Sequence, residues 1–409
     1  MVQDLDFLGT VLGLKAPWRI VRSELNLAKG FIDAEAACEG PVSCPTCGKP
    51  AGKYDHRQRR WRHLDLFQYE FYLTADVPRV ECPEHGVIQV TVPWANGKSG
   101  FTALFERMAI LLLLQMSITG VAKHLRISWD EVDGIMERAV TRGLQRRESR
   151  IVRYIGIDEK AVKKGHKYFT IVSDLESGTV LWIGRGRKKE TINAFWKELS
   201  GEQLAGIEGI AMDMWLPYFE SAIAHVPDAE NKIVFDKFHI TSYLTKAVDQ
   251  TRRRLMRDPS VEHDDLKGTK YVWLRNPSNM DSTERRKLAA LRNQYAKLGR
   301  AWAIKEQFAE FWRYRRESRA RSFLASWYGW ATRSQIPAIA EAAKTIKRHF
   351  ANILTYLKIP ITNAGAEGLN SKIQMIKYRA RGYRNESRFE RAILFHCGGL
   401  DLFPTHSNS

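Results

Sequence analysis

The order of hydrophobic patterns between residues 151 and 236 is the feature that most constrains the fold. Three segments alternate apolar and polar residues as strands do, at 151–158, 167–174 and 179–186. Four more elements follow, which are a helix at 190–200, a strand at 207–213, a helix at 216–226 and a strand at 232–236. Successive strands that give way to alternating helices and strands predict a sheet covered by helices, an α/β layer fold.

Length and charge restrict the class of protein further. A chain of 409 residues is too long for one core, so we expect two to four domains. The 64 Lys and Arg against 46 Asp and Glu give a net charge of +18, which favours nucleic acid as partner. Five cysteines are too few for a disulfide scaffold. The longest apolar run, 109–116, is too short to span a bilayer. We therefore expect a soluble protein of a reducing compartment, without a membrane partner.

Two short knuckles in the first hundred residues indicate a metal site. The ligand pairs are Cys44-x-x-Cys47 and Cys82-x-x-His85, and a glycine follows each pair. Two pairs at this spacing can surround one tetrahedral Zn²⁺, and the glycine lets the backbone turn back toward the thiolates. We predict one structural zinc there. Two other histidines are alternatives to His85 as the fourth ligand, namely His56 and His63.

Residues 118–139 have the pattern of a helix-turn-helix. A short helix ends near Leu125, and Ser128 followed by Glu131 predicts a capping box at the start of the second helix. That second helix is expected to enter the major groove of DNA, with Trp129, Asp130 and Asp133 near the exposed start of its first turn, and Lys123 and Arg126 are expected to contact DNA. The acidic residues of that turn are poor phosphate partners, so a purely structural three-helix unit is the alternative.

Two carboxylates end strands of the predicted sheet. Asp158 closes the strand 151–158 and Asp213 closes the strand 207–213. If these strands are parallel neighbours, the two side chains emerge at one edge, where they repel unless a divalent cation lies between them. Oxygen ligands select Mg²⁺ or Mn²⁺, and two such ions serve phosphodiester chemistry. An aspartate at a strand end is more often a solvated cap, so a third ligand is needed to favour the metal site.

Four motifs taken together resemble a known family. They are GIDE at 156–159, AMDMWLPYF at 211–219, VFDKFH at 234–239 and TNAGAEGLNSKIQMIKYRARGYRN at 362–385. They resemble the signatures of DDE transposases of bacterial insertion sequences, specifically the ISL-three family. The knuckles and the helix-turn-helix match the N-terminal region of that family in kind and order, so the resemblance covers nearly the whole chain.

This resemblance implies an RNase-H-like core interrupted by a large α-helical insertion, and a catalytic trio of Asp158, Asp213 and Glu367. Two Mg²⁺ (or Mn²⁺) ions would be held by the trio. Glu159 is a rival ligand, but neighbouring strand residues point to opposite faces, so it should face away from the metal. Asp236 and His239 form a D-x-x-H motif that we interpret as support for the active site, although a buried core histidine is the alternative.

Basic residues gather in the helical part of the chain. Residues 251–350 hold 23 Lys and Arg against 10 Asp and Glu. Tryptophans there are expected to be mostly core, while arginines on the same helices would contact the DNA of the element ends. The predicted contacts, on the insertion and on the final helix, are Arg313, Arg316, Lys372, Lys377, Arg379 and Arg381.

These patterns divide the chain into six segments. They are a zinc-binding β-rich domain at 1–95, the helix-turn-helix domain at 96–150, the first part of the catalytic core at 151–250, the α-helical insertion at 251–355, the final core helix at 356–399, and a loose tail at 400–409.

The predicted activity is DNA transposition in the bacterial cytosol. The enzyme would bind the terminal inverted repeats, hydrolyse the strand at the element ends and join the 3′-hydroxyl to double-stranded target DNA, as a homodimer or larger assembly. The alternatives are a DNA-binding regulator that has lost catalysis and a metal-dependent nuclease with the same RNase-H-like core.

Overall fold

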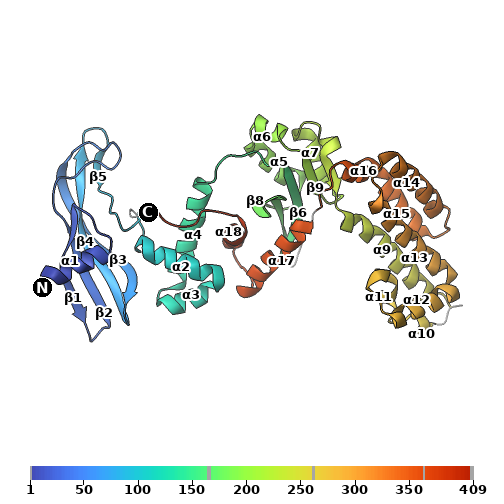
Figure 1. Ribbon diagram of the computed structural model, residues 1–409, viewed down its shortest axis with the longest axis horizontal. Helices are drawn as coiled ribbons and strands as arrows, with labels where there is room; N and C mark the ends of the chain where they lie inside the picture. Colours follow the sequence, from blue (N-terminus) through green and yellow to red (C-terminus); the bar gives the residue numbers. More distant parts are fainter. Residues whose placement is uncertain (1, 164–166, 260–262, 363, 406–409) are drawn as a thin grey trace. The chain divides into compact units, whose positions relative to one another are not determined.

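The computed structural model describes residues 2–163, 167–259, 263–362 and 364–405 (Figure 1). The chain forms two compact units. The first unit combines residues up to Glu148 with residues from Met375 onward, and the second unit runs from Ser149 to Gln374. The predicted boundary at 355/356 placed the whole final helix in the core, whereas the contacts divide that helix between the two units.

The first unit begins with a short helix, α1 (Val2–Val11), which is followed in the sequence by a five-stranded sheet. Its strands are β1 (Trp18–Asn26), β2 (Phe31–Cys38), β3 (Gly52–Leu66), β4 (Tyr69–Cys82) and β5 (Gly86–Gln89). The order is β1-β2-β4-β3, and β5 pairs with β4. Trp94 fills the core with its ring edge-on to Trp18 and Trp61, at centroid distances of 4.8 and 5.4 Å. The predicted β-rich N-terminal region is thus confirmed, including its first hairpin.

Three helices follow the sheet: α2 (Ala103–Gln115), α3 (Ile118–Leu125) and α4 (Trp129–Gln145). Ser117 caps α3, and Ser128 with Glu131 forms the predicted capping box of α4. Arg126 ends α3 in the left-handed conformation, φ 55°, and this makes the tight turn between the two helices. The predicted helix-turn-helix is therefore present with the expected bounds.

The C-terminal part of the chain completes the first unit. Helix α18 (Glu386–Cys397) packs on α4, and the residues after it run along α4. A Cβ on Gly143 would lie 2.6 Å from Leu400, so only glycine allows this close approach. Residues 400–404, which we predicted as part of a loose tail, are packed here, and Leu402 is buried. Residues 406–409 lie outside the described residues.

The second unit is built on a mixed sheet whose order is β10-β9-β6-β7-β8. Its strands are β6 (Tyr154–Lys163), β7 (Lys167–Asp174), β8 (Thr179–Arg185), β9 (Gly209–Met212) and β10 (Ile233–Phe235). Strands β6, β7 and β8 are antiparallel neighbours, whereas β9 is parallel to both β6 and β10. The accompanying helices are α5 (Lys189–Glu198), α6 (Gly201–Ala205), α7 (Leu216–His225) and α8 (Ala229–Lys232). The predicted α/β layer is confirmed.

One strand is longer than its sequence pattern indicates. The ladder between β6 and β9 stops at the pair Ile157 and Met212, but β6 stays paired with β7 as far as Lys163. Asp158 therefore lies within β6, and the prediction that it ends the strand was wrong. The charged residues 158–160 did not stop the strand because β7 continues to satisfy its backbone groups.

A helical array fills the rest of the second unit. It consists of α9 (Lys237–Leu255), α10 (His263–Leu266), α11 (Lys270–Leu274), α12 (Ser282–Gln294), α13 (Ala296–Ala309), α14 (Glu317–Thr332), α15 (Pro337–Arg348) and α16 (Phe350–Lys358), with 3₁₀ turns at Pro277–Asn279 and Glu310–Arg313. The array starts directly after β10, earlier than the predicted residue 251. Trp273 and Trp327 are buried in its core, as expected for most tryptophans of this region.

Helix α17 (Ala364–Arg379), predicted as the final helix of the core, begins six positions after the last residue of α16. None of the described helices is long and apolar enough to cross a membrane.

Candidate active site and metal centre

The parallel pairing of β6 and β9 brings two aspartates to one edge of the sheet. Ile157 pairs with Met212, and the residue that follows each of them is a predicted carboxylate, Asp158 within β6 and Asp213 directly after β9. Parallel strands run in the same direction, so both side chains leave the sheet at its carboxyl edge, where ligands bind in open α/β folds. The predicted metal site depends on parallel pairing of these two strands, and this pairing is present.

Burial makes these two carboxylates difficult to ionise together. Desolvation raises the pKa of Asp158, although its Oδ1 accepts a hydrogen bond from the Glu159 amide at 2.7 Å. The pKa of Asp213 rises to about 8, first because of burial and then because of the negative charges of Asp158 and Asp236. Among the described residues, neither aspartate forms an ion pair with a lysine or arginine. The edge thus holds acidic groups that lack a permanent counter-charge.

The D-x-x-H motif lies beside Asp213. Asp236 follows β10, is buried, and caps α9 by accepting a hydrogen bond from the Phe238 amide at 2.6 Å. The cap fixes the start of α9, so that His239 Nε2 lies 3.0 Å from Asp213 Oδ1. His239 is partly exposed, with 43% of its side-chain surface open to solvent, so it is not a fully buried core histidine.

Glu159 has a different environment from Asp158. Its carboxylate lies 3.2 and 3.3 Å from Arg187 Nη1, and Arg187 in turn stacks on the rings of Tyr168 and Trp215 at 4.3 and 5.0 Å. An arginine held in this way neutralises Glu159 and leaves it a weaker candidate for a cation. The sequence analysis did not identify Arg187, because nothing in a local pattern connects it to residue 159.

Helix α17 supplies a contact that the sequence analysis also missed. Asn370 Nδ2 donates a hydrogen bond to Asp158 Oδ2, and Lys160 Nζ donates to the Asn370 carbonyl at 3.3 Å. Glu367, the predicted third carboxylate, belongs to α17, but its side chain lies outside what the structure describes. Glu367 and Asn370 are three positions apart, and residues three apart lie on the same face of a helix. This spacing is the signal that could have identified Asn370 as a residue of the site.

The two knuckles come together in the first unit. The ligand atoms of Cys44, Cys47, Cys82 and His85 all lie within 4.8 Å of one another, which fits one tetrahedral ion. Backbone N–H groups, that of Cys47 first, lower the pKa of the Cys44 thiol to about 6, and a hydrogen bond from His85 lowers that of Cys82. The thiolate form is thereby favoured at Cys44 and Cys82, whereas the pKa of the Cys47 thiol is raised.

The conformation of the knuckle glycines agrees with the prediction. Gly48 and Gly86 have φ of 72° and 66°, the left-handed conformation that glycine adopts without strain. His63 does not join this cluster, because its Nδ1 lies 2.8 Å from the Thr102 hydroxyl, and His56 is an exposed residue of β3. His85 is therefore the histidine of the cluster.

The start of the second helix of the helix-turn-helix is less open than predicted. Asp133 is buried, and its Oδ2 lies 3.0 Å from both Arg388 Nε and Arg391 Nη1 of α18. The expectation of exposure was wrong for Asp133, because a helix from the far end of the sequence covers it, whereas Trp129 and Asp130 are exposed as expected. Arg126 is also engaged, with its guanidinium 2.5 Å from Asp65 Oδ2 and 2.9 Å from Glu70 Oε1.

The other predicted DNA contacts are basic residues of mixed exposure. Arg313 pairs with Glu310 at 2.7 Å. Arg313 is exposed, as are Lys123, Lys372, Arg316, Arg379 and Arg381, while Lys377 is half-buried. They belong to different units: Arg313, Arg316 and Lys372 to the second, and Lys123, Lys377, Arg379 and Arg381 to the first. Their contact with DNA stays a prediction.

Comparison with known proteins gives the same assignment for three regions. A family profile described as "Transposase" matches residues 155–393. A second, described as "Helix-turn-helix domain of transposase family ISL3", matches residues 90–140. A third, the "zinc-finger of transposase IS204/IS1001/IS1096/IS1165", matches residues 40–85.

Two curated relatives extend over most of the chain. The "Transposase for insertion sequence element IS1557" of Mycobacterium tuberculosis (strain H37Rv) is 32% identical over 396 residues, covering 89% of this chain and 88% of the relative. The "Transposase for insertion sequence element IS1001" of Bordetella parapertussis is 28% identical over 352 residues, covering 85% of this chain and 86% of the relative. With its carboxylate edge, zinc knuckles and helix-turn-helix, this chain belongs to the ISL3 family of DDE-type transposases.

Proposed function

We propose that the second unit cuts and joins DNA strands, with Asp158, Asp213 and Glu367 as its catalytic carboxylates. The observation that carries this proposal is the placement of Asp158 and Asp213 at the end of one parallel ladder, without a lysine or arginine partner among the described residues. Asn370 supports the choice of Glu367 as the third carboxylate. Asn370 contacts Asp158 from α17, and Glu367 lies one turn earlier in the same helix.

We also propose that this unit has an RNase-H-like fold. Its sheet has three antiparallel strands on one side and two parallel strands on the other, with the first strand, β6, in the centre. The long helical array between β10 and α17 corresponds to an insertion before the final helix of such a core. The sheet order and the position of the carboxylates at the end of β9 support this proposal.

The residues at this edge fit divalent cations. Asp213 Oδ1 is buried, and His239 Nε2 lies 3.0 Å from it without forming an aligned hydrogen bond, so this oxygen can still be satisfied by a cation. Carboxylate oxygens prefer hard ions, so Asp158, Asp213 and Glu367 would hold Mg²⁺ or Mn²⁺. When bound, such ions lower the pKa of an attacking water and stabilise charge on the leaving oxygen.

The protein side chains then have separate roles. Asp158 is held in place by Asn370 and by the Glu159 amide, so its orientation does not depend on substrate. His239 limits the movement of Asp213. In the reaction, hydrolysis at the element end breaks one phosphodiester bond and frees a 3′-hydroxyl. That hydroxyl attacks a target phosphodiester, so that one P–O bond forms as another breaks.

The first unit is proposed to bind the terminal inverted repeats, with its zinc site serving a structural role. The helix-turn-helix supports contact of this unit with double-stranded DNA, and the net charge of +18 supports such contact for the chain as a whole. Because two element ends must be processed together, we propose a homodimer or larger assembly. DNA as substrate also favours the bacterial cytosol as the place of action.

The test of the catalytic assignment is strand cleavage by purified full-length protein on duplexes that carry the element end. Asp158→Ala and Asp213→Ala should each abolish Mg²⁺-dependent cleavage while leaving end binding within about twofold of wild type, because they remove metal ligands outside the DNA-binding unit. Glu220→Gln is the matched control, since Glu220 is an exposed carboxylate of the same unit that pairs with Lys189 at 3.0 Å.

Two outcomes would refute the assignment. Cleavage that persists in Asp158→Ala would show that the carboxylate edge is not the active site. End binding by wild type without any metal-dependent cleavage or joining would instead indicate a DNA-binding regulator, and cleavage without joining would indicate a nuclease.

A further inference from the structure

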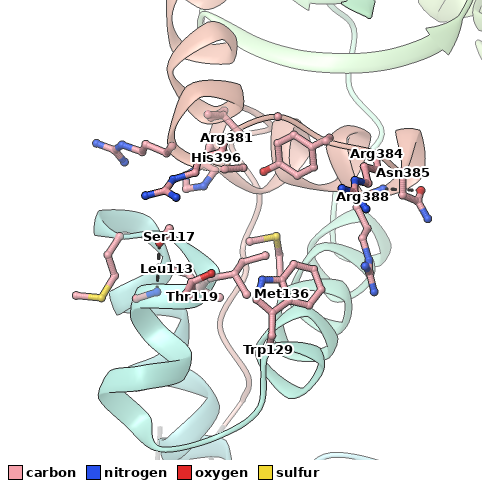
Figure 2. Close-up of a pocket in the computed structure, with 18 of the residues that line it drawn as sticks. Leu113, Ser117, Thr119, Trp129, Met136, Arg381, Arg384, Asn385, Arg388 and His396 are labelled. Atoms are coloured by element: carbon pink, nitrogen blue, oxygen red, sulfur yellow. Dashed lines mark hydrogen bonds between the residues drawn. The ribbon is translucent and has the colours of Figure 1, made fainter.

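A groove of about 630 Å³ lies inside the first unit, between the helix-turn-helix and the C-terminal segment (Figure 2). One wall comes from α3 and the start of α4 and includes Ser117, Thr119 and Trp129. The other wall is the segment Arg379–Arg388, which joins the end of α17 to the start of α18. We call this segment the basic strap. Its Arg381, Arg384 and Arg388 face the helix-turn-helix across the groove in Figure 2.

The lining of the groove is charged with one sign only. Five of its residues are cations, namely Lys123 from α3 and Arg379, Arg381, Arg384 and Arg388 from the strap. None of its lining residues is an aspartate or glutamate. Within the described part of the chain, Lys123, Arg379 and Arg381 have no carboxylate partner, and all three are exposed. Exposed cations that lack a carboxylate partner, as these three do among the described residues, have an anion as their natural ligand.

Three acidic residues of α4 form ion pairs with arginines of α18. Asp130 and Asp133 pair with Arg388, at 3.3 and 3.0 Å, and Glu137 pairs with Arg391 at 2.6 Å. Helix α18 thus neutralises three carboxylates of α4 that would otherwise repel a phosphate beside Trp129, while Glu131 is engaged in the capping box with Ser128. Arg388 also lies over the Trp129 ring, 4.5 Å from its centroid, so the strap and α4 are fixed to each other.

We propose that this groove binds the sugar-phosphate backbone of duplex DNA, and that the basic strap is therefore part of the DNA-binding module of the first unit. The inference deepens the proposed function, because it rests on end binding by that unit. It gives the helix-turn-helix a positioning contact from a segment more than 230 residues later in the chain. Phosphate contacts fix the register of a protein on DNA without reading sequence.

Duplex DNA is favoured over a small anion by the extent of the cationic surface. The cations come from both walls and from separate elements, whereas a single phosphate is usually held by a few groups converging on one point. Arg379 and Arg381 are both exposed and lie two residues apart on the strap, with Lys123 on the facing wall. This distribution suits successive phosphates of a strand.

The experiment compares DNA binding by full-length variants, without added Mg²⁺ so that cleavage plays no part. The triple variant Lys123→Gln, Arg379→Gln, Arg381→Gln removes cations from both walls and keeps side-chain length. Each lost phosphate contact should reduce the slope of log affinity against log salt by about 0.9, so the triple variant should lose between about 2 and 3 units of slope. Affinity near 0.15 M salt should fall at least about tenfold, equally for end and unrelated duplexes, because backbone contacts carry no sequence information.

A charge-matched control separates the groove from net charge. The control variant replaces three exposed lysines of the same unit that do not line the groove, Lys15, Lys29 and Lys98, each by Gln. Its salt slope should stay within about 0.5 of wild type. The single variant Lys123→Gln should lose about one third of the slope that the triple variant loses. Because this variant leaves the strap unchanged, the test stays valid if the strap substitutions disturb folding.

The possible results distinguish this inference from the proposed function. If wild type binds ends and the triple variant binds with unchanged slope, the groove is not a backbone site, although end binding stands. If the control loses as much as the triple variant, only net charge matters and the inference is overturned. If wild type binds no duplex at all, the proposed end binding fails first. Competition by inorganic phosphate at millimolar concentration, without a change in slope, would assign the groove to a small anion.

Discussion

Replacement of Asp133 by Asn tests whether burial decides the strength of the contact between α4 and α18. Asp133 has 10% of its side-chain surface exposed and lies 3.0 Å from Arg388 and from Arg391. The substitution keeps the size of the side chain and removes its charge. Arg391, which is 16% exposed, would then be a nearly buried cation whose remaining partner, Glu137, is mostly in solvent.

The magnitude follows from these exposures. Removing one partner of a fully buried ion pair costs about 3–5 kcal/mol. Arg388 is 40% exposed and can be hydrated instead, and Arg391 keeps Glu137, so the expected cost is lower, about 2–3 kcal/mol. Glu137 is 59% exposed, so Glu137→Gln on the same helix, against the same arginine, should cost less than about 1 kcal/mol.

Hydrogen–deuterium exchange of α18 measures this difference locally. Because about 1.4 kcal/mol corresponds to a factor of ten, the expected cost of Asp133→Asn should speed exchange of α18 amides roughly 30- to 140-fold. Glu137→Gln should speed it less than about fivefold. Equal effects of the two substitutions, or an Asp133→Asn effect below about fivefold, would refute the argument that burial rather than pairing sets the energy.

Three further predictions concern groups whose protonation or metal binding is altered by the fold. Burial lowers the pKa of His396 to about 4, so the folded state keeps this ring neutral while the unfolded state takes up a proton. The unfolding free energy of the first unit should therefore fall by about 2 kcal/mol as pH drops from 6.5 to 4, and His396→Gln should remove most of that dependence in urea unfolding. The pKa of Asp213, about 8, predicts that Mg²⁺ affinity measured by calorimetry rises about tenfold between pH 7 and 9, because the ligand must be ionised. Cys82→Ser should reduce bound zinc well below one ion per chain by elemental analysis and should loosen β4 and β5 in hydrogen exchange.

Each of these has a clear contrary result. An unchanged pH dependence in His396→Gln would place the titrating group elsewhere. An affinity for Mg²⁺ that stays flat between pH 7 and 9 would contradict a raised pKa at the metal site. Full zinc content in Cys82→Ser would contradict the four-ligand site, and Cys38→Ser serves as control because Cys38 does not belong to the cluster.

The local features of the fold could be predicted because they depend on neighbouring residues. The alternation of apolar and polar residues predicted where the strands of the second unit lie. The pair Ser128 and Glu131 predicted where α4 begins. The metal knuckles were equally clear, because ligand spacing and the following glycines are local constraints. Such patterns predict which secondary-structure element forms, because propensity and capping act within a few residues.

The errors came from partners distant in sequence. Asp158 was expected to end its strand, but β7 continues to pair with β6 beyond it. Asp133 was expected near the exposed start of the second helix, but the arginines that bury it follow more than 250 residues later. Asn370 could not be singled out as a partner of Asp158, because a polar residue on a helix gives no local sign of its contact.

The first unit is discontinuous in sequence, and this affects the order in which the protein can fold. A ribosome releases residues up to Glu148 long before it makes α18, and until then Asp133 has neither of its arginine partners. The second unit, by contrast, is one continuous segment that can close on itself first. A nascent chain should thus pass through a state in which the sheet and helices of the N-terminal region exist but the α4 surface is still open. A gene product cut short before residue 386 would remain in that state, with an unpaired carboxylate in place of a finished DNA-binding unit.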